Sequence, residues 1–132
     1  NSEYLNSIEV KATKKNTKWY LDTSKDKLKI IKEVLNKEKN KKYLSDIIAY
    51  TLVLRIRTLY IIEKLIKNEK YSKKEFIKLI KNISNGVNSY ERYLAVKNNR
   101  EEEHKADIGE VKRLCGYLDK QLQKIKKLVN NI

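Results

Sequence analysis

The sequence predicts an all-α protein, a bundle of about five helices with a short β-hairpin at its N-terminal end. Proline is absent and only three glycines occur in 132 residues, so little interrupts a helix. Apolar residues recur every three or four positions over most of the chain, which is the spacing of one helix face. Serine, threonine or aspartate precedes several of these segments and can cap a helix. At this length we expect a single domain over residues 1–132.

The hairpin is predicted over residues 1–22. Apolar and polar residues alternate over 8–12, a turn-like segment follows, and 18–21 (Lys-Trp-Tyr-Leu) is rich in strand formers. The helical bundle is then expected to occupy residues 23–132. Its first helix can be capped by Thr23 or Ser24 and should end near residue 36.

Three helices follow in the predicted bundle. The segment from Ser45 to about residue 67 is apolar on nearly every face, so it should lie at the centre of the bundle. Ser72 and Glu75 form a capping box for a third helix that ends at Asn85-Gly86, where glycine can adopt a left-handed conformation. A short fourth helix should occupy about 88–99.

The last helix is predicted to begin at Asp107, with Glu110 three residues later as a capping pair. Its apolar residues recur at alternating spacings of three and four, which is a heptad pattern: Ile108, Val111, Cys115, Leu118, Leu122, Ile125, Val129 and Ile132. A regular seam needs a long partner helix. We expect that partner to be the 45–67 helix of the same chain. Dimerisation through the seam is the alternative, and Gly116 beside it would allow close backbone approach.

Charge is the strongest indication of function. The chain has 31 Lys and Arg against 17 Asp and Glu, a formal net charge of +14. The excess is concentrated in residues 11–42, 64–81 and 112–127, whereas 100–110 is mostly acidic. Such a surplus favours a polyanionic partner, and nucleic acid or nucleotide phosphate is the first candidate. A lysine-rich surface adapted to heat or to an AT-rich genome is the alternative explanation.

Several classes of site and location are limited by composition. Cys115 is the only cysteine and His104 the only histidine, so the chain can form neither an internal disulfide nor a Cys/His zinc site. The most apolar stretch, 47–54, is much shorter than the roughly 20 residues that cross a bilayer. No signal peptide is visible. We therefore expect a cytoplasmic protein with no membrane partner.

Two arginines interrupt the most apolar helix. Arg55 and Arg57 are the only charges between Asp46 and Glu63. Two positions apart on a helix, they point in nearly opposite directions and cannot share one pocket. We expect one to be structural, paired with Asp46, with Glu63 or with a carboxylate on another helix. The other is a candidate phosphate ligand, because a guanidinium offers bidentate donors to phosphate oxygens.

Tyrosines near basic residues suggest stacking surfaces for bases, although tyrosine at helix spacing is often half-buried packing. Aromatic rings interleaved with cations suit single strands and nucleotides. The densest mixture lies between Tyr90 and Arg100. The predicted contact residues are Arg55, Arg57, Tyr60, Tyr90, Arg92, Tyr93, Lys97 and Arg100.

An enzymatic alternative rests on Arg100-Glu-Glu-Glu-His104. This segment is similar to the Arg and His pair of HEPN ribonucleases, in which Arg steadies phosphate and His moves a proton. The three glutamates would repel an RNA backbone, so His104 is better explained as an exposed linker residue. No nucleophile-base pair, glycine-rich phosphate loop or carboxylate metal motif is visible elsewhere.

The order of features from Trp19 onward resembles the C-terminal helical domain of archaeal nucleotidyltransferase-fold proteins. The segments that carry the resemblance are 19–28 (WYLDTSKDKL), 54–62 (LRIRTLYII), 70–76 (KYSKKEF), 90–97 (YERYLAVK) and a final amphipathic helix. It implies a helical domain that helps to bind substrate while aspartates on a separate sheet hold metal and nucleotide. Those aspartate motifs are absent here.

A weaker similarity is to the helical C-terminal region of archaeal primase large subunits and their noncatalytic accessory subunits. It rests on Arg55 before an apolar run and on the helix start from Ser72 to Glu75. The iron-sulfur cysteines of that region are missing, because Cys115 stands alone. A relative of this kind would bind template or nucleotide without a cluster.

These observations predict a noncatalytic module that binds DNA, RNA or nucleotides, with a single strand as the preferred polymer. Catalysis would belong to a partner subunit or another domain. No cofactor is expected beyond a bound nucleotide such as ATP. The competing hypothesis is a structural module that docks a protein through its heptad helix, and the third is the ribonuclease.

Overall fold

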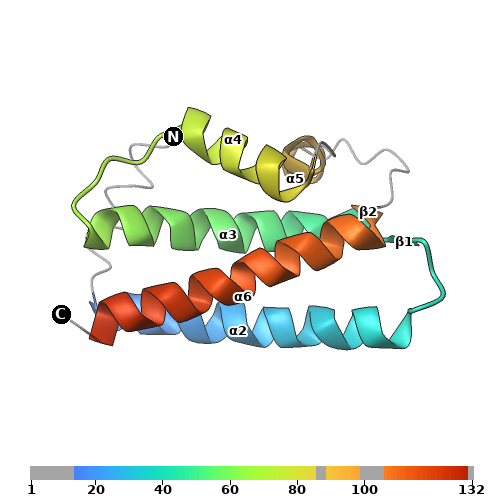
Figure 1. Cartoon of the computed structure of the whole chain (residues 1–132), viewed down its shortest axis with the longest axis horizontal. Coiled ribbons are helices and arrows are strands. Elements are labelled where there is room, and N and C mark those ends of the chain that lie inside the picture. Colours follow the sequence, from blue (N-terminus) through green and yellow to red (C-terminus); the bar gives the residue numbers. More distant parts are fainter. Residues whose placement is uncertain (1–13, 86–88, 99–105, 131–132) are drawn as a thin grey trace.

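The computed structural model describes residues 14–85, 89–98 and 106–130 (Figure 1). The described residues form a mostly helical bundle, as predicted, with five helices and two strands of two residues each. In chain order these are α2 (Lys14–Lys37), β1 (Tyr43–Leu44), α3 (Asp46–Ile66), α4 (Lys73–Ile83), α5 (Ser89–Lys97), β2 (Ala106–Asp107) and α6 (Ile108–Asn130).

The predicted N-terminal hairpin is wrong. Residues 18–21 lie inside α2, and residues 1–13 are outside the described part of the chain. Thr17, Ser24, Leu28 and Ile31 are buried at intervals of seven, four and three residues, so one helical stripe runs through the supposed strand. The burial of this stripe stabilises the helix more than the strand propensity of residues 18–21 favours a strand.

The two strands that do form are distant in the sequence. β1 and β2 pair antiparallel, with Tyr43 opposite Asp107 and Leu44 opposite Ala106. The backbone N–H of Ile108 also donates to the carbonyl of Lys42, at 3.2 Å. This pair therefore joins the start of α3 to the start of α6.

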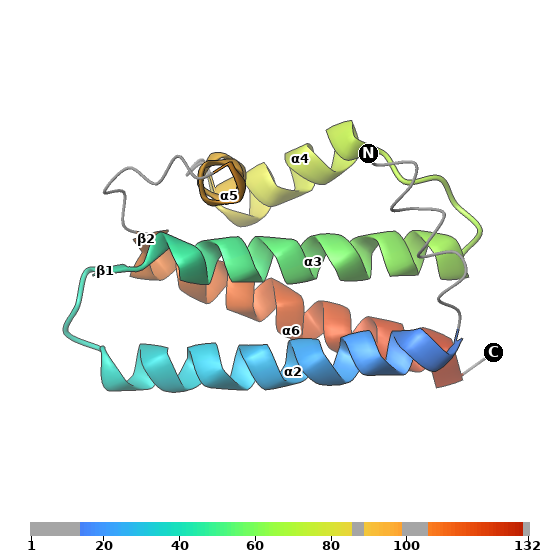
Figure 2. The ribbon, with the colours of Figure 1, turned by 180° about the vertical axis from the view of Figure 1, so that it is seen from behind.

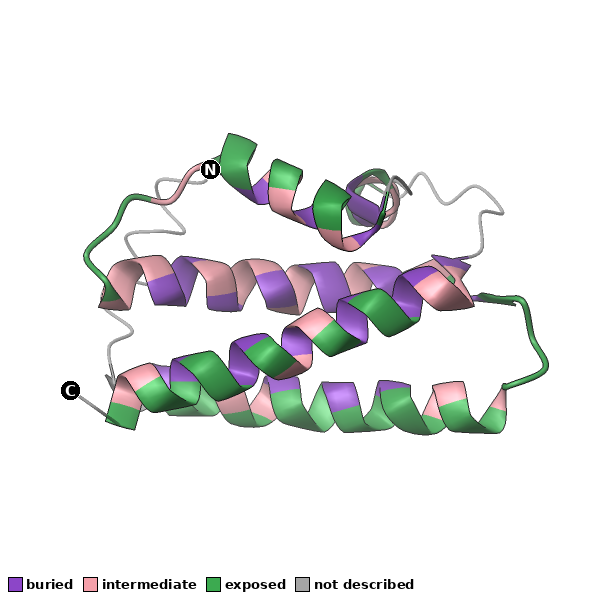
Figure 3. Cartoon of the chain, viewed as in Figure 1, coloured by how far each residue is buried: buried purple, intermediate pink, exposed green. Residues whose placement is uncertain are grey.

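Helix α3 lies at the centre of the molecule, as its apolar sequence predicted. Ser45 caps it, with its hydroxyl accepting from the N–H of Ile47 at 3.3 Å. α4 and α5 lie on one side of α3, and α2 with α6 on the other (Figures 1 and 2). Figure 3 shows that α3 is buried or intermediate along nearly all its length, whereas the outer faces of α2, α4 and α6 are exposed.

Helix α6 uses its heptad seam inside the chain. Asp107 caps the helix, with its Oδ2 accepting from the N–H of Gly109 at 2.8 Å and of Glu110 at 3.3 Å. The seam packs on α3, as predicted, and also on α2. Val111, Leu118 and Ile125 are fully buried there. The surface that dimerisation or docking through this seam requires is therefore covered.

The expectation for Gly116 is wrong. Gly116 is exposed, and a Cβ added to it would meet nothing within 4 Å. It faces solvent at mid-helix and mediates no close backbone approach.

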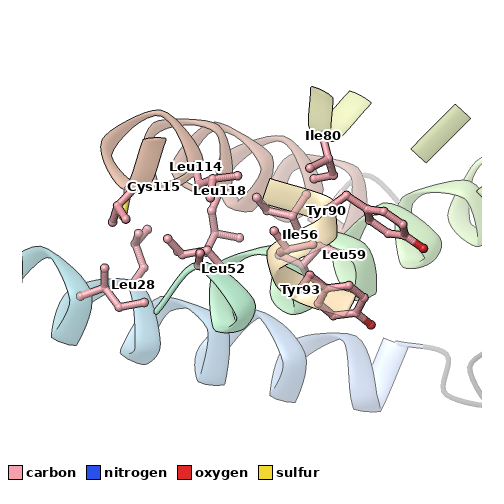
Figure 4. Packing of buried hydrophobic residues seen from close by; sticks show 14 of the residues in the cluster. Leu28, Leu52, Ile56, Leu59, Ile80, Tyr90, Tyr93, Leu114, Cys115 and Leu118 are labelled. Atoms are coloured by element: carbon pink, nitrogen blue, oxygen red, sulfur yellow. The ribbon is translucent and has the colours of Figure 1, made fainter. Parts of the chain in front are cut away.

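Helices α4 and α5 form the second layer. The hydroxyl of Ser72 accepts from the N–H of Glu75 at 3.2 Å, which confirms the predicted cap. The left-handed residue at the end of α4 is Asn85, at φ 54°, and Gly86 lies outside the described residues. Figure 4 shows Tyr90 and Tyr93 of α5 against Ile56 and Leu59 of α3.

Within the described residues, none of the helices combines the length and the apolar character that a bilayer crossing requires.

Candidate functional site

Arg57 lies on the side of α3 that faces α4 and α5. Its guanidinium carbon is 5.7 Å from the centroid of the Tyr71 ring, a cation–π distance. The residue is partly exposed. Among the described residues it forms no ion pair, so its charge meets rings and hydroxyls rather than a carboxylate. A cation in this position is stabilised by solvent or by an anion.

Two tyrosine hydroxyls lie in the field of Arg57. Burial raises the pKa of Tyr71, and the Arg57 charge opposes this shift without cancelling it. Burial likewise raises the pKa of Tyr93, again against the charge of Arg57. Both phenols therefore stay protonated at neutral pH and can donate a hydrogen bond.

Further rings and cations surround this group. The Tyr60 ring lies 5.9 Å from Tyr71, and the ammonium of Lys64 is 5.3 Å from the Tyr60 centroid. On α5, the ammonium of Lys97 is 5.9 Å from the Tyr93 centroid. We call Arg57, Tyr60, Tyr71, Tyr93 and Lys97 the tyrosine–arginine cluster.

The tyrosine–arginine cluster is chemically a set of donors. It offers a guanidinium, an ammonium and neutral phenols, and it contains no carboxylate. Phosphate oxygens are the acceptors that such groups suit best, because Arg contacts them in a bidentate manner and hydroxyls add single bonds. Of the predicted contact residues, the structure brings together Arg57, Tyr60, Tyr93 and Lys97, with Tyr90 packed on Tyr93 at 5.7 Å.

Tyr90 and Tyr93 are less accessible than a stacking surface requires. Their exposed fractions are 9% and 4%, because both rings pack on α3. Tyr50 stacks on Tyr93 at 5.3 Å, and Phe76 meets Tyr90 at 6.3 Å. Figure 4 shows the hydroxyl oxygens of Tyr90 and Tyr93 pointing away from the aliphatic cluster. In this arrangement they can contribute hydroxyls, but a base cannot reach their faces.

Arg55 lies apart from the tyrosine–arginine cluster, as the helix geometry predicted. Its Nη1 donates to the hydroxyl of Thr23 on α2 at 3.1 Å. Its Nε is buried and has no partner in the described part of the chain. The expected pairing with Asp46 or Glu63 is wrong, because Arg92 contacts Asp46 and two lysines contact Glu63.

Arg92 is committed to a structural network. Its Nε lies 3.1 Å from Oε1 of Glu110, which is completely buried, and its Nη1 lies 3.5 Å from Oδ1 of Asp46. The hydroxyl of Ser89 also donates to Glu110 and lies 2.8 Å from the hydroxyl of Ser84. Arg92 thus joins α3, α5 and α6, and a phosphate would have to compete with two carboxylates for it.

Sequence reasoning missed Tyr71 as a member of the site. Tyr71 precedes the Ser72 cap, a position that suggests a local packing role. The ring instead meets Tyr60 and Arg57 of the central helix. Beyond the capping position of Glu110, nothing in the sequence indicates its buried network, because its partners Ser89 and Arg92 lie on another helix.

Arg100, His104 and Cys115 are the remaining candidate residues. Arg100 and His104, the proposed ribonuclease pair, lie outside the described residues. Burial raises the pKa of Cys115 to about 11, so its thiol is a packing group. No group of three or more His, Cys, Asp or Glu side chains in residues 14–85, 89–98 and 106–130 could hold a metal ion.

Comparison of the chain with protein-family models, with curated proteins and with solved structures finds no match. The similarity to nucleotidyltransferase-fold and primase helical domains therefore stays a prediction.

Proposed function

We propose that this chain is a noncatalytic module that binds nucleic acid or nucleotide phosphate for a nucleotide-polymerising or nucleotidyl-transferring partner. The observation that carries the proposal is Arg57, a cation without a carboxylate partner among the described residues, set beside the hydroxyls of Tyr71 and Tyr93. The net charge of +14 supports the same class of ligand.

Several carboxylates of the described residues are already in ion pairs. Glu63 pairs with Lys67 and Lys124, and Glu110 pairs with Arg92. Asp119, Glu38 and Glu69 each pair with one lysine. Many of the remaining lysines are exposed and take part in no ion pair among the described residues, so their charges are available to an anionic partner.

The test uses two matched arginine variants. Arg57→Gln and Arg55→Gln remove the same charge from the same helix, on opposite sides of it. The probes are ATP and a short labelled single-stranded oligonucleotide, measured by fluorescence anisotropy and chemical shift mapping in dilute buffer. We expect Arg57→Gln to weaken binding about tenfold or more, because a hydrogen bond to a charged group contributes about 1.5–3 kcal/mol.

We expect Arg55→Gln to change the affinity less than about twofold, because Arg55 points toward Thr23. Binding should also weaken steeply as salt rises. If the wild-type chain binds neither probe at low salt, the proposal is wrong. If the two variants weaken binding equally, Arg57 is not the phosphate ligand.

A further inference from the structure

A second basic surface lies on the other side of α3, between α2 and α6. The two helices run antiparallel and pack against each other (Figures 1 and 2). Lys32 of α2 contacts Asp119 of α6, with Nζ 3.5 Å from Oδ2. This ion pair identifies which flank of each helix faces the other.

The helical repeat then places other lysines on the same flanks. Lys18, Lys25 and Lys29 precede Lys32 by fourteen, seven and three residues, so they share its side of α2. On α6, Lys126 follows Asp119 by seven residues and shares its side. Because the helices are antiparallel, Lys25 and Lys126 both lie about 10 Å from the ion pair in the same direction. We call Lys18, Lys25, Lys29 and Lys126 the lysine face.

The charges of the lysine face are available to a partner. All four lysines are exposed, and no ion pair or hydrogen bond involves their side chains in the described part of the chain. One carboxylate, Asp22, lies among them on α2. From Lys18 to Lys29 the face extends about 16 Å, close to the rise of five base pairs in one strand of a duplex.

The lysine face contains no aromatic side chain that could stack on a base. Among the described residues, the exposed large apolar side chains are Trp19, Ile30, Tyr43 and Ile47. Trp19 and Ile30 share the stripe of α2 that contains Asp26 and Glu33, at intervals of seven, four and three residues, and not the stripe of Lys25. Without rings, contact is limited to phosphates, which carry no direct sequence information.

An anionic membrane is the less suitable partner. Interfacial helices insert an apolar face between lipids. The apolar residues of α2 and α6, such as Leu28, Leu118 and Leu122, are buried in the core. The face therefore offers charge without an inserting surface.

Resting on the proposed function, we propose that the lysine face holds the phosphodiester backbone of nucleic acid without contacting its bases, so that duplex and single strand both bind there. The tyrosine–arginine cluster and the lysine face are thus two separate contact surfaces, on opposite sides of α3.

The test compares two triple variants of equal charge. One is Lys25→Gln with Lys29→Gln and Lys126→Gln, and the control is Lys73→Gln with Lys74→Gln and Lys78→Gln on α4, all at exposed positions. The probes are a labelled DNA duplex, a single strand of equal length, and phosphatidylserine/phosphatidylcholine vesicles. Each affinity is measured across a salt series, and circular dichroism confirms that both variants fold.

We expect the wild-type chain to bind the duplex at least as tightly as the single strand. The lysine-face variant should lower the slope of log K against log salt by up to about three, because each lost phosphate contact lowers it by about one. The α4 variant should lower it by less than one. Scrambling the base sequence of the duplex should leave the affinity unchanged.

Equal losses in the two triple variants would mean a general charge effect and would overturn the lysine face. A wild-type chain that binds only single strands, or vesicles more tightly than duplex, would also overturn it. These results leave the Arg57 proposal standing if Arg57→Gln still weakens ATP and single-strand binding. Failure of the wild-type chain to bind any nucleic acid or nucleotide would end both proposals.

Discussion

At the scale of single residues, the arginines differ in what they contact. Arg92 meets two carboxylates, Arg55 meets a threonine hydroxyl, and Arg57 meets aromatic rings and phenols. Composition and charge predicted a group of arginines near tyrosines but could not distinguish these three roles. Which partner an arginine finds depends on residues that are distant in sequence, as with Glu110 and Arg92.

Glu110 should be the most sensitive polar position in the core. It is fully buried and accepts from Ser89 and Arg92. Glu110→Ala would leave Arg92 without its buried partner, and we expect it to lower the free energy of unfolding by about 3–5 kcal/mol. Urea denaturation measures this, with the exposed Glu33→Ala as control. A loss below about 1 kcal/mol would show that the network does not stabilise the fold.

Glu63 should make stability depend on acid pH. Burial alone would raise the pKa of Glu63, but hydrogen bonds from Lys124 and Lys67 hold it below its usual range. Because the folded state binds this proton less tightly than the unfolded state, the stabilisation is complete above about pH 5 and falls as the pH drops.

Thermal unfolding of wild type and Glu63→Gln between pH 7 and pH 3 checks this prediction. The wild-type protein should lose more stability than the variant over that range, so the two curves converge in acid. Parallel curves would mean that the pKa of Glu63 is the same in the folded and unfolded states. Lys124 is largely exposed, so the effect is expected to be modest.

At the scale of helices and strands, capping residues located three of the predicted helix starts. Thr23 and Ser24, the predicted caps of the first helix, were wrong, because both lie inside α2. Ser45, Ser72 and Asp107 each accept from backbone N–H groups at the start of the predicted helix. Caps act over a few residues, so they can be recognised locally. The segment 18–21 was wrongly predicted as a strand because its residues are typical strand formers. Its helical burial pattern becomes visible only in the packing of α2 on α3 and α6.

Asp22→Pro tests the corrected start of the chain. Asp22 is exposed and lies well inside α2, so proline there would remove a backbone hydrogen bond and clash with the preceding turn. We expect a loss of about 3 kcal/mol or more in the free energy of unfolding, whereas Asp22→Ala should be neutral or slightly stabilising. Urea denaturation measures both. If the proline is tolerated as well as the alanine, residue 22 does not lie inside a helix.

Gly116 of α6 is a position where a substitution should stabilise a helix. An exposed glycine inside a helix costs about 1 kcal/mol relative to alanine, and an added Cβ meets no atom here. Gly116→Ala should therefore raise the free energy of unfolding by about 0.5–1 kcal/mol in the same assay. A destabilised variant would indicate a contact at Gly116 that the present fold lacks.

At the scale of the whole molecule, the heptad seam of α6 would predict self-association of the chain only if its apolar residues were exposed to solvent. It is covered by α2 and α3, so we expect the chain to remain monomeric. Sedimentation equilibrium over a wide concentration range measures this. Leu118→Asp should unfold the protein, because it buries a charge in the core. A concentration-dependent dimer that Leu118→Asp dissociates into folded monomers would show that the seam is an interface.

The bundle itself could be predicted from periodicity and composition, but the separation of its basic surfaces could not. Lys25 and Lys126 are far apart in sequence and come together only through the antiparallel packing of α2 and α6. The charge of Arg57 on α3 likewise acts on the pKa of Tyr93 on α5, a residue that is distant in sequence. Net charge indicates the class of partner, whereas the fold decides which cations act together.

The pairing of β1 with β2 has a consequence for the order in which the protein folds. In the sequence, α3, α4 and α5 lie between β1 and β2. The two strands can therefore pair only after this long segment of chain has brought its ends together. Loop closure costs entropy that two short strands cannot offset by themselves. Individual helices form within microseconds from local contacts. We therefore expect β1 and β2 to pair late in folding, after the helices between them have formed and packed.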